Sequence, residues 1–252
     1  VYYGAVLAWG VQYTIYSVNA AWGDDPTTFF TDTFLQVVPG DTFSWAPAWA
    51  VMIPLALVWI LVLFVIGRGL SKGVEAANKI FLPLLVILFL ALVIRALFLP
   101  GAVEGLNAFF TPNWAALADP KVWLAAFAQI FYSLSVGFGI MLTYASYLKP
   151  KSNLTGTALV AGFANSSFEI LAGIGVFSAI GFMAHQGGVS VSEVDGLSGP
   201  ILSFVTFPKI ISMMPGGPLF GVLFFSSLVL AGVTSLLSLL QVVSGGLQDK
   251  FG

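Results

Sequence analysis

The sequence predicts an all-α integral membrane protein with six transmembrane helices, one of which is broken near the middle of the membrane. Apolar residues make up 58 % of the 252 residues and charged residues only 8 %, whereas a soluble domain carries about 25 % charged residues. The apolar runs are long and continuous rather than alternating, which excludes a membrane-spanning β-barrel. Charged residues separate these runs at intervals that suit spanning helices of about 20 residues.

Six apolar segments are long enough to cross a bilayer. The third is short between Lys79 and Arg95, but both side chains can snorkel to the interfaces. The sixth is longer than a bilayer requires, so it is expected to tilt or protrude. The predicted spans cover residues 1–20, 45–67, 79–99, 122–147, 154–183 and 217–247.

The charges predict the orientation of these spans. Six of the nine basic residues lie on one side of the predicted bilayer: Arg68, Lys72, Lys79, Lys149, Lys151 and Lys250. Eight of the eleven acidic residues lie on the other: Asp24, Asp25, Asp32, Asp41, Glu104, Asp119, Glu193 and Asp195. The positive-inside rule assigns the basic side to the cytoplasm of a plasma membrane, so both ends of the chain are expected there.

The two ends of the sequence suggest a piece of a longer protein. The chain begins inside an apolar segment without Met and stops at a helix end, so residues 1–252 are expected to form one membrane domain truncated at both ends. Residues 184–216 are expected to be an extracellular loop. Within it, Pro200 to Met214 shows helical spacing of apolar residues, which suits either a lid-like hairpin over the extracellular mouth or an ordinary interfacial loop.

Several function classes are excluded by what the sequence lacks. A net charge of −2 without a basic patch argues against nucleic-acid binding, and the absence of cysteine excludes disulfides and thiolate chemistry. The segment GRGLSKG lacks the spacing of a phosphate-binding loop, and no Gly-x-Ser-x-Gly or His-Glu-x-x-His pattern occurs. The chain is therefore predicted not to be an enzyme. The single histidine, His185, is expected to be a solvated loop residue.

The fourth span contains polar and small residues near its middle. Ser133 and Ser135 are followed by Gly137 and Gly139. Serine and glycine weaken a helix, and non-helical backbone at membrane depth is tolerated only where it lines a cavity. This pattern predicts a broken helix. The alternative is close helix packing by small residues.

The fifth span carries the one charge that lies away from the membrane edges and the loops. Glu169 lies four residues after Asn165, so the two side chains share a helix face. A carboxylate in a membrane is costly, and an amide oxygen beside it favours a hard cation. The alternative is a buried glutamate hydrogen-bonded to a neighbouring helix.

The sixth span carries a polar face, and the first span opens with tyrosines. Hydroxyls and carbonyls on that face could form a neutral oxygen cage for Na⁺, or the hydroxyls could bond to their own helix. Tyr3, beside Tyr2, could lie at mid-membrane or in an interfacial aromatic belt. The residues of the polar face are Ser227, Ala231, Thr234, Ser235, Ser238 and Gln241.

At these residues the sequence resembles the neurotransmitter:sodium symporter family, in particular its bacterial amino-acid transporters, from their third to their eighth helix. The resemblance is carried by QIFYSLSVGFGIMLTYASYLKP, NSSFEILAGIGVF, GPILSFVTFP and AGVTSLLSLLQ, by Tyr2-Tyr3 with Trp9, and by Gly73 and Pro83 in a Gly-x9-Pro pattern. It implies an inverted-repeat transporter fold with a midplane site. It also implies sodium-coupled symport of an amino acid by alternating access. The implied partners are sodium, the amino acid and the lipid bilayer, and the resemblance leaves open whether the protein forms an oligomer.

The resemblance assigns roles to individual residues. Tyr132 would be an outer aromatic gate with Tyr3 below it, while Phe138 and Leu239 would contact the apolar part of the substrate. The implied substrate-binding set is Tyr3, Tyr132, Ser133, Ser135, Phe138, Ser235 and Leu239. Two sodium sites would use Ser133 and Asn165, and Ala231 (through its carbonyl), Thr234 and Ser235, with other ligands outside this chain.

Two further sets follow from the resemblance. Gln129, Ser133 and Glu169 match the site that holds chloride in other members, and the charge of Glu169 would replace that anion, which implies chloride-independent transport. Gly73 and Pro83, with Lys72 nearby, would let the third span unwind on the cytoplasmic side.

The competing functions are an ion channel and a non-transporting membrane receptor. A broken helix with an aromatic gate, rather than a repeated pore ring, favours the transporter, and the aromatic and leucine side chains favour an apolar or aromatic substrate.

Overall fold

The computed structural model describes residues 2–37, 46–149, 151–197 and 199–251, all of them in helices, turns or loops. Asp41, and the first residue of the predicted span 45–67, lie outside the described residues. The elements in chain order are α1 (Tyr2–Tyr16), α2 (Pro26–Thr28), η1 (Phe29–Phe34), α3 (Trp49–Gly67), η2 (Leu70–Glu75), α4 (Ala76–Leu97), α5 (Ala102–Phe110), η3 (Trp114–Ala118), α6 (Pro120–Ser133), α7 (Ile140–Ser146), α8 (Leu154–Gly187), η4 (Val191–Glu193), α9 (Gly199–Ile201), η5 (Leu202–Thr206), α10 (Phe207–Met213) and α11 (Gly217–Phe251).

Four helical runs in the described residues are long and apolar enough to cross a membrane: α3, Lys72–Leu97, α8 and α11. They correspond to the second, third, fifth and sixth predicted spans. The first predicted span is shorter than expected, because α1 ends at Tyr16 and the left-handed backbone of Ala20 (φ 49°) cannot continue an α-helix. The fourth predicted span consists of the two short helices α6 and α7.

The fifth predicted span extends beyond its expected end. Helix α8 continues to Gly187, and Gly188 ends it in a left-handed C-cap (φ 64°). His185 therefore lies in the last turn of a helix, and the expectation of a loop residue is wrong. Its Nδ1 lies 3.1 Å from Oε1 of Glu104 in α5. At about 1.5 Å per residue, α8 and α11 are each about 50 Å long, which exceeds the hydrocarbon thickness of a bilayer.

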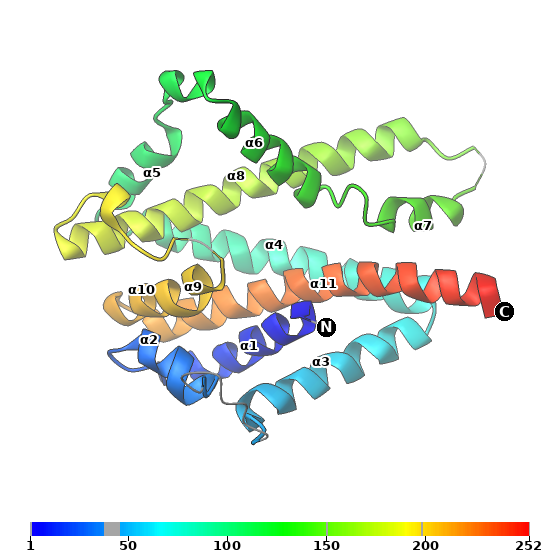
Figure 1. The fold of residues 1–252 in the computed structure, drawn as a ribbon, viewed down its shortest axis with the longest axis horizontal. Helices are drawn as coiled ribbons and strands as arrows, with labels where there is room; N and C mark the ends of the chain where they lie inside the picture. Colours follow the sequence, from blue (N-terminus) through cyan, green and yellow to red (C-terminus); the bar gives the residue numbers. More distant parts are fainter. Residues whose placement is uncertain (1, 38–45, 150, 198, 252) are drawn as a thin grey trace.

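The helices form two groups joined by α4 (Figure 1). One group contains α1, α3, α10 and α11, and the other contains α5, α6 and α8. Helix α4 packs against both α8 and α11. The turn from α3 to η2, the connection from α7 to α8 and the C-terminus lie at one end of the molecule, and α2, η4 and α10 lie at the other (Figure 1). We call the first the basic end, since it carries Arg68, Lys72, Lys149, Lys151 and Lys250, and the second the acidic end, since it carries Asp24, Asp25, Glu193 and Asp195.

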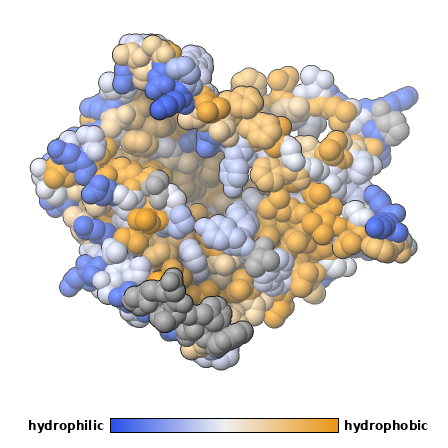
Figure 2. Space-filling view, in the orientation of Figure 1, coloured by the Kyte–Doolittle hydropathy of each residue, from blue (hydrophilic) through white to orange (hydrophobic). Residues whose placement is uncertain are grey.

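The surface follows the same division. Hydrophilic residues gather toward the two ends of the visible face, and an apolar region extends between them (Figure 2). Large exposed side chains such as Ile60, Leu63 and Phe64 of α3 contribute to the apolar exterior. This arrangement is typical of a protein whose helices are solvated by lipid.

The acidic end contains a densely packed aromatic core. Tyr13 of α1 and Phe225 of α11 are fully buried, with ring centroids 5.2 Å apart. The segment expected to be a loop at 184–216 contributes to this core. Phe204 of η5 lies parallel to Phe30 at 5.8 Å, and Phe207 of α10 stacks on Phe224 at 4.1 Å. The stretch from Pro200 to Met214 is therefore largely helical and packed onto the outer turns of α1 and α11.

Candidate functional site

The break in the fourth predicted span lies between Ser133 and Ile140. Ser135, Gly137 and Gly139 have φ angles of 55°, 84° and 78°, which are left-handed values that an α-helix cannot contain. The expected break is confirmed, and the alternative of a continuous helix that packs closely through its small residues is wrong. Turn hydrogen bonds, such as that from the N–H of Ser135 to the carbonyl of Tyr132, replace the regular α-helical bonds along this stretch.

The first predicted ion-binding pair is brought together across this break. Nδ2 of Asn165 in α8 donates a hydrogen bond of 2.6 Å to Oγ of Ser133, the last residue of α6. Both side chains are half-buried. The amide oxygen of Asn165 and the hydroxyl oxygen of Ser133 are suitable neutral ligands for a hard monovalent cation.

The residues expected at the chloride-like position are arranged less closely. Glu169 is half-buried one helical turn beyond Asn165, and Gln129 is exposed one turn before Ser133. Within the described residues, neither side chain makes a hydrogen bond or ion pair. The alternative of a glutamate hydrogen-bonded to a neighbouring helix is therefore absent from this structure.

The second predicted ion-binding cluster lies within one turn of α11. Oγ1 of Thr234 and Oγ of Ser235 donate to the carbonyl oxygen of Ala231 at 2.8 and 3.2 Å. These bonds are the own-helix alternative that the sequence left open. They also hold three neutral oxygens together, and each hydroxyl keeps lone pairs that a cation could share. At the ends of the same polar face, Ser227 and Gln241 are buried.

The predicted substrate residues flank the break. The Tyr3 hydroxyl interacts with Ser235 and lies near Tyr132. It is also close to Gly232 of α11, where a Cβ would collide with Leu7. Tyr132 is exposed and meets Phe138 edge to face, with ring centroids 6.0 Å apart. Ser135 forms the left-handed turn of the break and is half-buried.

An apolar groove follows the break on the α6 side. Its volume is about 530 Å³, and Leu239 of α11, which is half-buried, is not among its lining residues. It is lined by Phe127, Ala128, Phe131, Tyr132, Val136, Gly137 and Phe138.

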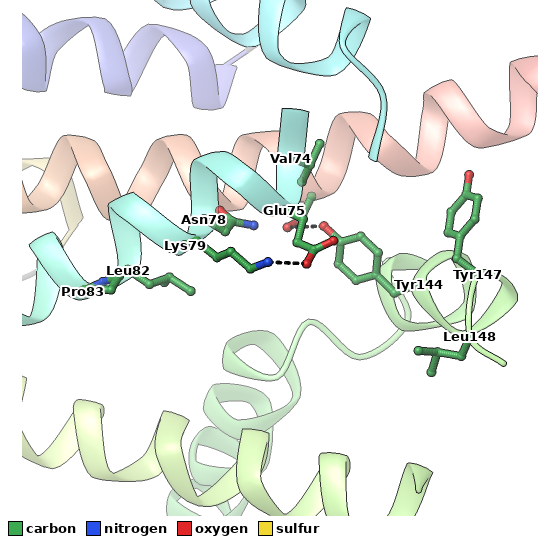
Figure 3. Close-up of a pocket in the computed structure, with 10 residues that line it drawn as sticks. Val74, Glu75, Asn78, Lys79, Leu82, Pro83, Tyr144, Tyr147 and Leu148 are labelled. Carbon is green, nitrogen blue, oxygen red and sulfur yellow. Dashed lines mark hydrogen bonds and ion pairs between the residues drawn. The ribbon is translucent and has the colours of Figure 1, made fainter. Parts of the chain in front are cut away.

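A larger pocket of about 780 Å³ opens between the start of α4, α7 and α11 (Figure 3). Pro83 and Asn78 line it from α4, Tyr144 from α7, Tyr147 from the C-cap of α7, and Ser238 from α11. Figure 3 shows Lys79 and Glu75 at its edge, where Nζ of Lys79 lies 2.7 Å from Oε1 of Glu75.

The segment expected to unwind has wider turns than an α-helix. Gly73 lies in the π-helical turn η2, where a Cβ would collide with the carbonyl oxygen of Val65. Lys72 in the same turn is exposed. Pro83 lies inside α4, which remains helical through it although proline lacks the N–H that would bond to the preceding turn.

Two tyrosines of this pocket were not singled out from the sequence. The Tyr144 hydroxyl donates to Oγ of Ser238 at 2.9 Å, and Nε2 of Gln241 lies 3.5 Å from the Tyr147 hydroxyl. Two tyrosine hydroxyls one turn apart in a membrane half-helix need polar partners. That signal was present in the stretch TYASY.

Comparison with known proteins agrees with this architecture. The Sodium:neurotransmitter symporter family matches residues 22–252. An uncharacterized sodium-dependent transporter of Methanocaldococcus jannaschii is 39 % identical over 253 residues, covering 99 % of this chain and 51 % of that protein. A sodium- and chloride-dependent creatine transporter 1 of Bos taurus is 35 % identical over 212 residues, covering 82 % of this chain and 32 % of that protein.

A solved structure extends the comparison to the fold. The crystal structure of MhsT in complex with L-phenylalanine has a TM-score of 0.76 and 35 % identity, and the match covers 99 % of this chain and 53 % of MhsT. The chain thus spans about half the length of the most similar of these proteins. On the family match, the two relatives and the shared fold, this chain belongs to the sodium:neurotransmitter symporter family, a family of membrane transporters rather than enzymes.

Proposed function

We propose that the full-length protein is a plasma-membrane symporter that couples the inward flow of Na⁺ to the uptake of a neutral amino acid. The observation that carries this proposal is the 2.6 Å bond between Asn165 and Ser133, because it joins two neutral oxygen-bearing side chains at the break of a membrane helix. Family membership and a sodium-dependent relative support the choice of ion.

Two sodium ions would use different parts of the chain. The first would lie at Ser133 and Asn165, and the second at the Ala231 carbonyl with Thr234 and Ser235. All five groups offer uncharged oxygen, which suits a hard cation that must bind and leave again. The remaining ligands would come from helices outside this chain.

The proposed substrate is an apolar or aromatic amino acid. A helix that is broken at membrane depth suits the charged ends of an amino acid, and the groove beside the break is lined by aromatic rings. Tyr132 and Phe138 would cover the substrate, with Tyr3, Ser135, Ser235 and Leu239 around it. MhsT, which shares the fold, was crystallised with L-phenylalanine.

Transport is proposed to be independent of chloride. The carboxylate of Glu169 lies one turn from Asn165 and is not neutralised within the described residues, so it can offset the charge of bound cations. Gln129 and Ser133 would complete that position. Relatives named as chloride-dependent are 32 % to 37 % identical to this chain, so the proposal depends on Glu169 itself.

The orientation follows from the charges. We place the basic end in the cytoplasm and the acidic end outside, by the positive-inside rule. The pocket beside Pro83 and Ser238 would then be a cytoplasmic water route toward the second sodium cluster. Replacement of Pro83 by Ala restores a helical N–H and is expected to slow Na⁺ release to the inside. Release rates from proteoliposomes equal to wild type would contradict this role.

The proposal is tested by sodium-dependent binding and uptake. The full-length protein, reconstituted into vesicles, would be screened with radiolabelled phenylalanine, leucine, glycine and glutamate. We expect saturable uptake of phenylalanine or leucine with a fixed ratio of Na⁺ to substrate. A channel would give flux without saturation or fixed ratio, and a non-transporting receptor would bind substrate without accumulating it.

A further inference from the structure

Two hydrogen bonds in series link α7 to the backbone carbonyl of Thr234, a residue of the second oxygen cluster. The Tyr144 hydroxyl donates to Oγ of Ser238 at 2.9 Å, and that oxygen donates to the carbonyl of Thr234 at 3.2 Å. Oγ1 of Thr234 in turn donates to the carbonyl of Ala231 at 2.8 Å. The path therefore begins at the pocket of Figure 3 and ends at the proposed ligands of the second sodium ion.

The first bond of this path is the main polar contact between the two helices. Within the described residues, other side-chain contacts from α7 to α11 are longer, as between Tyr147 and Gln241 at 3.5 Å. The hydroxyls of Thr143 and Ser146 donate to backbone carbonyls of their own segment instead. Helix α7 has only seven residues, so a single bond is a large part of what orients it.

We propose that Tyr144 and Ser238 are positioning residues that couple occupancy of the second sodium cluster to the orientation of α7. This inference rests on the proposed function. A cation bound to the Ala231 carbonyl competes for the oxygen that now accepts the Thr234 hydroxyl. A shift of the Thr234 backbone reaches Ser238, because Ser238 donates to the carbonyl of that residue. The bond from Tyr144 to Ser238 lies in series with that bond, so the shift extends to Tyr144.

The pocket provides the readout of this coupling. Tyr144 forms part of its wall, and Leu148 lies one turn further along the chain at the same opening. When Na⁺ fixes Thr234 and Ser238, Tyr144 holds α7 against α11 and access to the opening falls. When the bond is lost, the pocket is equally accessible with or without Na⁺. Coupling of this kind is a difference in free energy between two sites, and it can be measured from either site.

The test uses Leu148→Cys in the full-length protein, after replacement of any cysteine outside these 252 residues, which contain none. Labelling by a membrane-impermeant maleimide from the basic side is followed with Na⁺ and with choline. We expect Na⁺ to slow labelling in the otherwise wild-type protein. In Ser238→Ala and Tyr144→Phe that difference should shrink, and the Na⁺ concentration for half-maximal substrate binding should rise about 2- to 10-fold, as for one hydrogen bond.

Matched variants separate coupling from general destabilisation. Ser146→Ala removes a hydroxyl of α7 that bonds only to its own segment, and Ser244→Ala removes a half-buried hydroxyl of α11 whose contact is with Gln248 on the same helix. Both should behave as wild type. Ser238→Thr keeps the hydroxyl and should restore the Na⁺ response. The double variant Tyr144→Phe with Ser238→Ala should be no worse than either single variant, because both remove one bond.

Three outcomes would overturn the inference, and they are distinguishable. If the parent protein responds to Na⁺ and both single variants respond equally, the coupling is absent while the proposed function stands. If the parent shows no Na⁺-dependent binding, the proposed function fails and the coupling fails with it. A loss of the response in Ser146→Ala equal to that in Ser238→Ala would also contradict it.

Discussion

The acidic-end core and helix α6 are built in opposite ways. In the core, Tyr13, Phe204 and Phe225 are almost fully buried and each ring meets several others. In α6, by contrast, every residue before Ser133 is exposed. The side chains of the core are buried by other residues of this chain, whereas the side chains of α6 are not covered by any part of the chain that the structure describes. The difference separates the part of the chain that fixes the fold from the part that surrounds the proposed site.

The largest expected effect tests this separation through Phe225 and Phe127. Phe225→Ala should lower the stability of the full-length protein by about 3–5 kcal/mol, because it leaves a cavity in a packed aromatic core. Phe127→Ala changes an exposed ring of α6 and should cost far less. Thermal unfolding in detergent measures both. Equal losses would show that segments outside this chain pack on α6 as tightly as the core is packed.

Next in size is the loss of a proposed sodium ligand beside the break. Asn165→Ala removes the donor to Ser133 and an oxygen available to a cation. A contact to a charged group contributes about 1.5–3 kcal/mol, so the Na⁺ concentration for half-maximal substrate binding should rise about 10- to 100-fold. Unfolding temperature should change little. The control is Ser166→Ala, an exposed neighbour on α8 that should keep the wild-type Na⁺ dependence.

The sequence predicts the helix break but not the end of α8 or the packing of residues 184–216. The break was visible because serine and glycine are poor helix formers at membrane depth, and the pairing of Asn165 with Ser133 followed from the family resemblance. The end of α8 was misplaced, because apolar content alone does not show whether Gly187 or Gly188 caps the helix. The 184–216 segment was undecided, since apolar spacing does not reveal which surface a short helix covers.

The pairing of Tyr144 with Ser238 could not be predicted. The two residues are 94 positions apart, and only the angle of the broken helix brings α7 against α11. The position of the Glu169 side chain relative to Gln129 could not be predicted from the sequence either. Its spacing from Asn165 fixes a shared helix face, but the distance to Gln129 depends on how closely α6 approaches α8. Local pattern identifies polar residues in a membrane helix; tertiary packing decides which of them meet.

A smaller effect is expected when the charge of Glu169 is removed. In Glu169→Gln the proposed compensation is lost while the shape is kept, so uptake should fall and become responsive to chloride. Uptake with chloride and with gluconate measures this directly. Glu193→Gln, at the exposed acidic end, is the matched control and should leave uptake insensitive to chloride. Wild-type uptake that requires chloride would refute the proposed role of Glu169 outright.

The smallest expected effect lies at the acidic end, in the cap of α2. A hydrogen bond from the Thr28 hydroxyl, with others from the N–H groups of Thr28 and Thr27 and the nearby charge of Lys209, lowers the pKa of Asp25 below its usual 3.8. A carboxylate with a lowered pKa in the folded state stabilises that state above its unfolded pKa, and the stabilisation disappears as the pH falls through the folded pKa.

Asp25→Asn should therefore be slightly less stable than wild type near neutral pH, and the two should converge in acid below the lowered pKa. Unfolding temperatures of the full-length protein between pH 2 and pH 7 measure this, with Asp24→Asn as the control. Within the described residues, the Asp24 carboxylate accepts no hydrogen bond. A difference that persists unchanged into acid would mean that shape rather than charge determines the cap. In that case even the weakest contact of the acidic end would act through packing, as its aromatic core does.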